Sequence, residues 1–154
     1  MKRIAIIALA ALALLAVTGC KTSGMAVTTR GQLLKLNIKH PNDLPEKGED
    51  SLDIVVSNRG VQSINDVLLD VELPAQLAVI DETHGRGIDV AHDPGSNLYH
   101  YTLGRVQPAE DTTIRYRVRT TFGSAREASV KATAWQRDLP GDKLVETAVI
   151  KLRQ

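Results

Sequence analysis

Residues 51–80 read SLDIVVSNRGVQSINDVLLDVELPAQLAVI, and apolar residues alternate with polar residues along much of this stretch. Leu52, Ile54 and Val56 alternate with Asp53 and Ser57. Such a period of two places successive side chains on opposite faces, which is typical of half-buried antiparallel strands. The same alternation recurs at residues 34–38, 67–73, 99–103, 114–118, 128–134 and 144–152.

Turn-forming residues separate these runs. They include Pro41-Asn42-Asp43, Asn58-Arg59-Gly60, Pro94-Gly95-Ser96 and Pro140-Gly141-Asp142. No stretch after residue 20 has a helical period long enough to compete. The pattern predicts an all-β fold over residues 32–154, an immunoglobulin-like antiparallel β-sandwich of seven to eight strands preceded by a helical signal peptide.

The first twenty residues have a different character. Lys2-Arg3 precedes fourteen consecutive apolar residues at 4–17, fewer than the roughly 20 that cross a bilayer as a helix but suited to a secretory signal. The residues VTGC at 17–20 resemble the bacterial lipobox. This resemblance implies a diacylglyceryl group on the Cys20 thiol, cleavage before Cys20 and acylation of its new amino group.

Lipidation at Cys20 would make the bilayer the first partner. We expect a signal peptide at 1–19 and a lipidated cysteine with a flexible tether at 20–31, which is polar and without period. Lys21 stands where enterobacterial lipoproteins kept at the inner membrane tend to have aspartate, so we expect a lipid-anchored protein of the outer membrane that faces the periplasm. An ordinary cleaved signal or an uncleaved anchor, with Cys20 incidental, is the alternative.

Several short motifs recur at the expected strand ends: Val56-Ser57-Asn58-Arg59-Gly60, Val71-Glu72-Leu73-Pro74, Leu103-Gly104, Thr113 to Val118 and Ala128 to Ala132. With these motifs, residues 32–152 resemble the "conserved repeat" domain of bacterial surface proteins, an immunoglobulin-like module of unknown function. The resemblance departs at Ala109-Glu110, where that family often has glycine-glutamate. The motifs mark strand ends and corners, so they imply a fold and carry no chemistry.

Composition excludes several classes of function. Residues 21–154 contain 50 apolar residues among 134, about 37%, enough for one core. They hold 17 basic and 18 acidic residues, a net charge of −1, which argues against nucleic-acid binding. Cys20 is the single cysteine, so an internal disulfide is impossible. We expect no cofactor.

Arg115, Arg117 and Arg119 alternate along one strand and point to one face, about 6.7 Å apart. They are a possible interaction surface for lipid phosphates, cell-wall carboxylates or an acidic partner. The alternative, which we favour, is cross-strand pairing with Asp70 and Glu72 on a neighbouring strand.

The stretch 81–97 reads as a polar loop with His84 and His92 as weak metal candidates. Two imidazoles with Asp89 and Asp93 could bind zinc. The spacing between the histidines matches no standard motif, and we expect no metal.

We predict a non-catalytic protein. The chain has no G-x-S-x-G elbow, no H-E-x-x-H and no phosphate-binding glycine loop. The predicted function is a structural or adaptor role, in which a sheet face or edge contacts another envelope protein or the cell wall. The alternative is a small-ligand or metal-binding lipoprotein that uses residues 81–97. Basic residues on the predicted edge strands discourage uncontrolled strand pairing: Lys35, Lys39, Lys143, Lys151 and Arg153.

Overall fold

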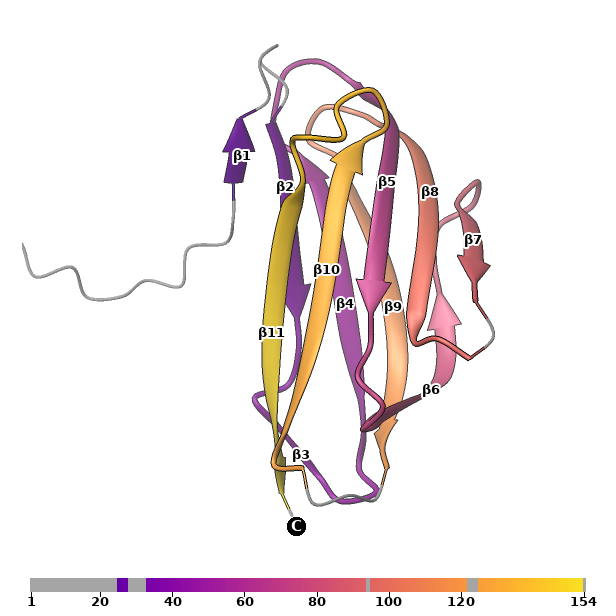
Figure 1. Cartoon of the computed structure of the whole chain (residues 1–154). Coiled ribbons are helices and arrows are strands. Elements are labelled where there is room, and N and C mark those ends of the chain that lie inside the picture. Colours follow the sequence, from indigo (N-terminus) through magenta and orange to yellow (C-terminus); the bar gives the residue numbers. More distant parts are fainter. Residues whose placement is uncertain (1–24, 28–32, 94, 122–124, 154) are drawn as a thin grey trace, which may run out of the picture.

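The computed structural model describes residues 25–27, 33–93, 95–121 and 125–153 (Figure 1). All regular structure in these ranges is β-strand, arranged in two sheets that face each other. Within them, no helix has the length and apolar character needed to span a bilayer. The predicted all-β sandwich is confirmed.

Eleven strands form the two sheets of the described chain. The first sheet has the order β1-β2-β4-β9-β6, from β1 (Met25–Val27), β2 (Leu33–Lys39), β4 (Glu49–Asn58), β9 (Asp111–Thr120) and β6 (Leu77–Thr83). The second sheet has the order β3-β11-β10-β5-β8-β7, from β3 (Asp43–Pro45), β11 (Leu144–Arg153), β10 (Glu127–Gln136), β5 (Ile64–Glu72), β8 (Leu98–Val106) and β7 (Asp89–His92). Neighbouring strands are antiparallel except for β11 and β3.

The alternating apolar residues form the core between the sheets. Ile54, Ile114, Leu69, Val130 and Ile150 come from five strands, and each is fully buried. Burial of one such side chain contributes about 1.5–3 kcal/mol relative to exposure. The period of two therefore acts through packing: the apolar row of each strand faces the opposite sheet.

The seven alternating runs correspond to β2, β4, β5, β8, β9, β10 and β11. Strand β6 is the eighth long strand, and its alternation is broken because the pairing with β9 shifts register between Val79 and Asp81. Strands β1, β3 and β7 exceed the predicted number. They have three or four residues each, too few to show a period.

Asn58 fixes the upper end of the sandwich as drawn in Figure 1. Its buried side-chain amide donates to the carbonyl oxygens of Gln62 at 2.7 Å and Val106 at 3.1 Å, and its Oδ1 accepts the Gly60 N–H at 2.9 Å. Its backbone pairs with Ala109 and Glu110. One asparagine thus joins β4 to the β8–β9 turn, which explains its place in the strand-end motif.

Ala109 has a φ of 60° in the turn between β8 and β9. An L-residue other than glycine pays a steric cost of roughly 1–2 kcal/mol in this left-handed conformation. The "conserved repeat" family, which the sequence resembles, often has glycine here, and the departure at Ala109 coincides with local backbone strain. The turn is supported by Glu110, whose Oε2 accepts the Gln107 N–H at 2.6 Å.

The predicted signal peptide, residues 1–19, and Cys20 lie outside the described residues. Part of the predicted tether is described: residues 25–27 form β1, which pairs with β2. The first sheet is therefore extended by a strand that the polar, aperiodic sequence around it does not indicate.

Candidate functional site

The three arginines lie on β9 with exposed side chains, on the outer face of the first sheet. Strand β9 pairs with β4 and β6. The expected neighbours Asp70 and Glu72 lie on β5, in the second sheet, so the predicted pairing with them is wrong. Alternation shows which side of a strand is buried, but it does not assign the strand to a sheet.

Two of the arginines find acidic partners on β4 instead. Arg115 donates two hydrogen bonds to the Asp53 carboxylate, from Nε at 2.7 Å and from Nη2 at 2.9 Å. The hydrogen bonds and positive charge of Arg115 hold the pKa of Asp53 below its usual value, against the opposing effect of burial. Arg119 pairs in the same way with Glu49, directly opposite in the register. The prediction of cross-strand ion pairs is therefore right about the type of contact and wrong about the partner strand.

Arg117 lies between these two pairs. Its register neighbours are Ser51 on β4 and Asp81 on β6. Among the described residues, none forms an ion pair with Arg117 within 4 Å. On the outer face of the first sheet, Arg115 and Arg119 are therefore neutralised by carboxylates. The guanidinium of Arg117 has no ion-pair partner among the described residues.

His84 and His92 lie in different surroundings, and the stretch 81–97 is not all loop. It includes the end of β6 and the whole of β7. His84 contacts the Gly85 carbonyl oxygen through Nδ1 at 3.0 Å, and His92 contacts the Ser96 carbonyl oxygen through Nε2 at 2.9 Å. No group of three or more histidine, cysteine, aspartate or glutamate side chains in the described ranges could hold a metal ion.

His84 instead meets part of the arginine row. A shallow depression of about 370 Å³ on the first sheet brings it together with Arg115. The other residues that line it are Lys39, Asp53, Thr83 and Thr113. Arg115 is already bound to Asp53 there, whereas Lys39 forms no ion pair within 4 Å with the described residues.

All three tyrosines gather between β8 and β9. The hydroxyls of Tyr101 and Tyr116 lie 2.5 Å apart, and the ring of Tyr99 meets that of Tyr116 edge-on, with centroids 5.4 Å apart. Burial is the main cause that raises the pKa of both Tyr101 and Tyr116 far above the ordinary value. These phenols stay protonated and neutral, so neither provides a nucleophile.

Glu82 reaches this cluster through the irregularity in β6. The shift of register places it opposite Tyr116, whose side chain is buried. The Oε1 atom of Glu82 is buried without a hydrogen-bond partner among the described atoms, and His84 Nε2 lies 3.9 Å from it. This group is not predictable from the sequence, because Asp81-Glu82 shows two adjacent acids but not which of them turns inward.

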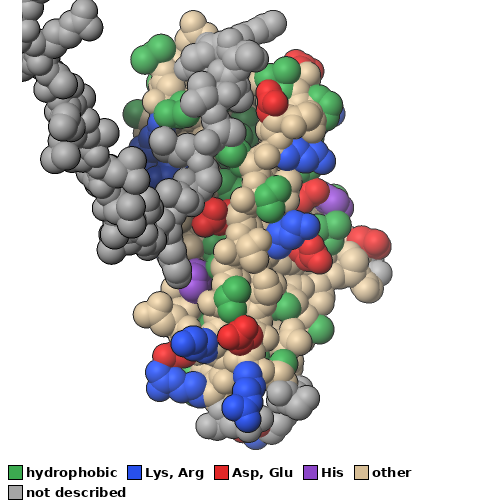
Figure 2. Space-filling view, turned by 60° about the vertical axis from the view of Figure 1, so that its left-hand side comes forward, with side chains coloured by type: hydrophobic (Ala, Val, Ile, Leu, Met, Phe, Trp, Pro, Cys, Tyr) green, Lys and Arg blue, Asp and Glu red, His purple; other side chains and the backbone are tan. Residues whose placement is uncertain are grey.

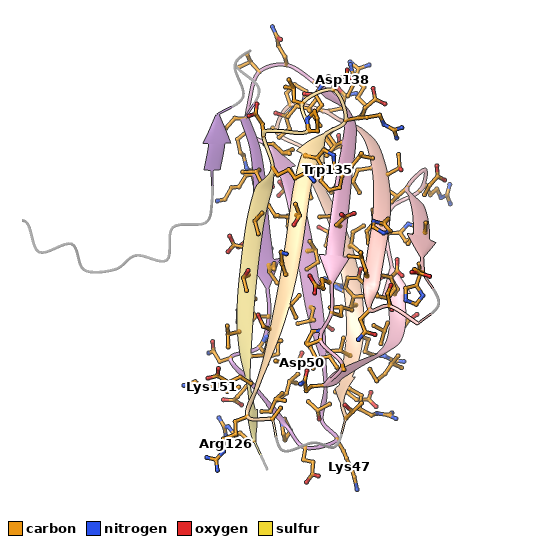
Figure 3. All side chains as sticks on the ribbon, viewed as in Figure 1. Lys47, Asp50, Arg126, Trp135, Asp138 and Lys151 are labelled. Carbon is orange, nitrogen blue, oxygen red and sulfur yellow. The ribbon has the colours of Figure 1, made fainter. Side chains whose placement is uncertain are left out.

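The outer face of the second sheet is different. Val145 and Val149 are 53% and 49% exposed on β11. They lie opposite Thr133 and Ser129 of β10. Trp135, the chain's single tryptophan, lies at the end of β10, and Lys143 Nζ is 4.6 Å from its ring centre (Figure 3). We call Trp135, Val145 and Val149 the valine–tryptophan face. The alternation along β11 already places both valines on the outward side of the strand.

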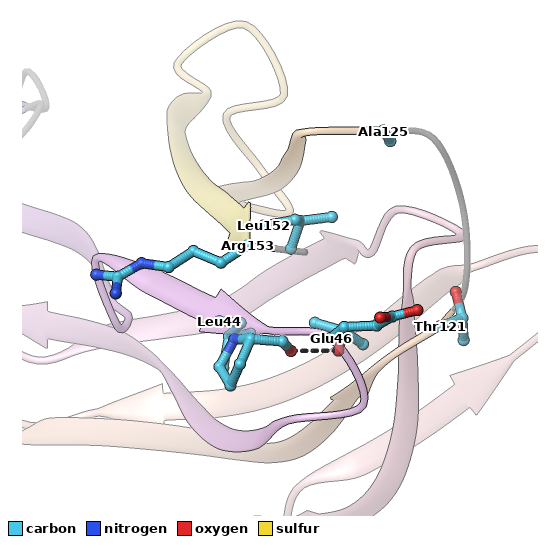
Figure 4. Close-up of a pocket in the computed structure, with 8 residues that line it drawn as sticks. Leu44, Glu46, Thr121, Ala125, Leu152 and Arg153 are labelled. Atoms are coloured by element: carbon cyan, nitrogen blue, oxygen red, sulfur yellow. Dashed lines mark hydrogen bonds between the residues drawn. The ribbon is translucent and has the colours of Figure 1, made fainter.

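A small cavity lies at the lower end, between β3, β9 and β11 (Figure 4). Its volume of about 20 Å³ is close to that of one water position. Leu44 and Leu152 line it, and the Thr120 hydroxyl donates to the Pro45 carbonyl oxygen at 2.7 Å beside it. A cavity of this size holds no organic ligand, so it is part of the packing of this end.

The chain matches no protein-family model and no curated protein sequence. Its fold is similar to that of solved structures. A chain of the RrgA Jo.In complex is 14% identical over 84% of this chain and 82% of that one, with a TM-score of 0.58. The CARDB domain of the PF1109 protein from Pyrococcus furiosus, in complex with di-metal ions, is 14% identical over 82% and 93%, with a TM-score of 0.55.

An uncharacterised protein from Nocardia farcinica with an immunoglobulin-like fold is 14% identical over 77% of this chain and 98% of that one, with a TM-score of 0.52. These similarities confirm the immunoglobulin-like fold. The finer resemblance to the "conserved repeat" family stays a prediction.

Proposed function

We propose that this protein is a bacterial envelope lipoprotein in which an acylated Cys20 anchors one immunoglobulin-like domain, and that the domain binds another protein without catalysis. The lipobox-like residues 17–20 and the preceding apolar segment support the anchor. Lys21 favours the outer membrane, with the domain facing the periplasm. The bound partner in this proposal is an envelope protein or a component of the cell wall.

The observation that carries the binding role is the valine–tryptophan face. Tryptophan is among the residues that most often anchor protein interfaces, and the exposed side chains of Val145 and Val149 add apolar area whose burial is favourable. The described part of the first sheet offers no comparable apolar surface. Its outer face is occupied by charged side chains that pair with each other, as in Asp53–Arg115 and Glu49–Arg119. A partner that docks on Val145 and Val149 displaces water from apolar atoms. Lys131, which pairs with Glu72, lies opposite Thr147 between the two valines and borders this contact.

The non-catalytic part of the proposal rests on how the reactive groups are used. The phenols of Tyr101 and Tyr116 are neutral and bonded to each other. His84 and His92 both contact backbone carbonyl oxygens. No nucleophile, base and orienting group come together in the described residues in the way that covalent catalysis requires.

Site-specific photocrosslinking in living cells tests the binding role. A photoreactive residue placed at Val149 should capture one discrete envelope protein, whereas the same residue at exposed Ser51, on the first sheet, should capture none. Equal adducts from both positions, or none from either, would overturn the assignment of the face.

The anchor has its own test. Mass spectrometry of the mature protein should show a fatty-acylated Cys20 as the first residue, and a Cys20→Ser variant should leave the membrane fraction. An unmodified cysteine, or a variant that still sediments with membranes, would remove the lipoprotein part and leave the binding role intact.

A further inference from the structure

Strand β1 determines where the chain leaves the sandwich. It pairs with β2 through Met25–Lys35, Ala26–Leu34 and Val27–Leu33, at the edge of the first sheet. Strand β1 therefore begins at the side of the sandwich and not at one of its ends (Figure 1). Cys20 lies five residues before Met25, and five extended residues span at most about 18 Å.

This length restricts which side can face a bilayer. Four inter-strand spacings separate β1 from β6 in the first sheet, a width of about 19 Å before side chains are added. A tether of about 18 Å is too short to pass around the molecule to the β6–β7 side. While β1 is paired, an anchor at Cys20 must hold the side of β2 near the membrane.

The side with β2 also carries positive charge. Strands β2 and β11 lie next to each other across the two sheets (Figure 1). Figure 2 turns this side forward and shows basic side chains gathered over its lower part. Strands β2, β3 and β11 contain four basic and two acidic residues, a net charge of +2: Lys35, Lys39, Lys151 and Arg153 against Asp43 and Glu146. Lys35 and Lys39 point outward from the first sheet and Lys151 and Arg153 from the second, so they flank the shared edge, and Arg153 pairs with Asp43.

The opposite side carries negative charge. From β6 to β7, the exposed charged residues are Asp81, Asp89 and Arg86, a net charge of −1, and Glu82 adds a carboxylate that turns inward. The β2–β11 side of the sandwich is therefore more positive than the β6–β7 side. Negatively charged lipid headgroups attract the β2–β11 side and repel the β6–β7 side.

We propose that the β2–β11 side is a membrane-contact surface that lies against phosphate-bearing, anionic lipid headgroups, with the β6–β7 side turned away. This rests on the proposed lipidation of Cys20. The contact orients the domain rather than anchoring it, because the acyl chains supply the attachment. Lys151 and Arg153 lie in the same outward row of β11 as Val145 and Val149, so the membrane-contact surface borders the valine–tryptophan face at the C-terminal end of β11.

Lysine footprinting of the lipidated full chain tests this surface. The protein is placed on phosphatidylglycerol or phosphatidylcholine vesicles, and acetylation of each lysine by a water-soluble reagent is followed by mass spectrometry. On phosphatidylglycerol the acetylation rates of Lys35, Lys39 and Lys151 should fall by about threefold or more, and high salt should reverse the effect. Lys131, exposed on β10, is the internal control and should not change.

Two variants separate orientation from attachment. Lys39→Glu with Lys151→Glu should abolish the difference between the two lipids, whereas Lys131→Glu should preserve it. A flexible Gly-Ser insertion after Lys21 keeps every charge but lengthens the tether, so it should weaken the protection of Lys35.

The outcomes are distinct. Equal protection of Lys131 and Lys39, or no protection on phosphatidylglycerol of a protein shown to be acylated, would overturn the membrane-contact surface alone. Absence of the acyl group on Cys20 would overturn the proposed anchor instead.

Discussion

The two outer faces of the sandwich use the same alternating strands in opposite ways. On the first sheet, outward residues of β4 and β9 pair across the strands as Asp53–Arg115 and Glu49–Arg119. On the second sheet, β10 and β11 present Trp135, Val145 and Val149 to solvent. The charged side chains of the first face are already paired with each other. Exposed apolar side chains are stabilised only when another surface covers them and removes them from water.

The largest effect is expected from a substitution that damages the frame shared by both faces. Asn58→Ala removes two donated hydrogen bonds and one accepted hydrogen bond at a fully buried position. Each buried polar group left unpaired costs about 1–3 kcal/mol. Urea unfolding should therefore show a loss of about 3 kcal/mol, with both faces disordered together, and a loss below about 1 kcal/mol would contradict the corner role of Asn58.

The second prediction separates the two faces. Trp135→Ala with Val149→Asp should lower crosslinking or affinity for the partner by about tenfold or more, because interface energy concentrates in a few buried anchors. The thermal midpoint should change little, since both side chains are outside the core. Arg117→Ala on the other face is the matched control and should bind normally. If the control loses binding and the double variant keeps it, the partner docks on the first sheet.

The third prediction concerns the charged face and pH. Arg115 lowers the pKa of Asp53 in the folded protein, so the pair stabilises the fold above the unfolded pKa of about 3.9 and is lost as the pH falls through the folded value. Asp53→Asn should lower the thermal midpoint at neutral pH by less than Asn58→Ala does. It should also make the midpoint less sensitive to pH below about 4.

Asp89→Asn is the control for this pH experiment. Asp89 is exposed on the edge strand β7 and forms no ion pair with the described residues. Its variant should follow the parent at every pH. Identical acid profiles for Asp53→Asn and the parent would show that the pair on the first sheet contributes nothing.

The smallest expected effect is an increase in stability. Ala109→Gly relieves the positive φ in the β8–β9 turn, against the greater freedom of glycine in the unfolded chain. The net result should be an increase of up to about 1 kcal/mol in the free energy of unfolding, measured by the urea midpoint. Ala109→Val should have the opposite sign, because a β-branched residue tolerates this conformation poorly.

Much of this fold was predictable from the sequence, since strands such as β9 and β10 bury every second residue without interruption. Strand β6 was not, because its register shift near Ile80 destroys the alternation. The sequence placed Arg115 and Arg119 on one face correctly, but it could not name Asp53 and Glu49 as partners. Strand pairing depends on which sheet each strand joins, and the period of a single strand carries no information on that.

The valine–tryptophan face shows a different limit. The outward position of Val145 and Val149 followed from the parity of Leu144, Ala148 and Ile150 in the same strand. Parity does not show whether outward side chains will be covered by their neighbours, because that depends on the residues across the strand. Here the neighbours are Ser129 and Thr133, which are too short to cover them.

The separation of the aromatic residues gives the protein two independent spectroscopic reporters. Trp135 is the only indole and sits at the surface beside Lys143, while the three phenols cluster around buried Tyr116. Selective excitation of the indole should therefore follow events on the valine–tryptophan face, and ultraviolet absorbance of the phenols should follow loosening between the sheets. The fluorescence of Trp135 and the absorbance of the tyrosines should therefore distinguish partner binding from unfolding without an added label.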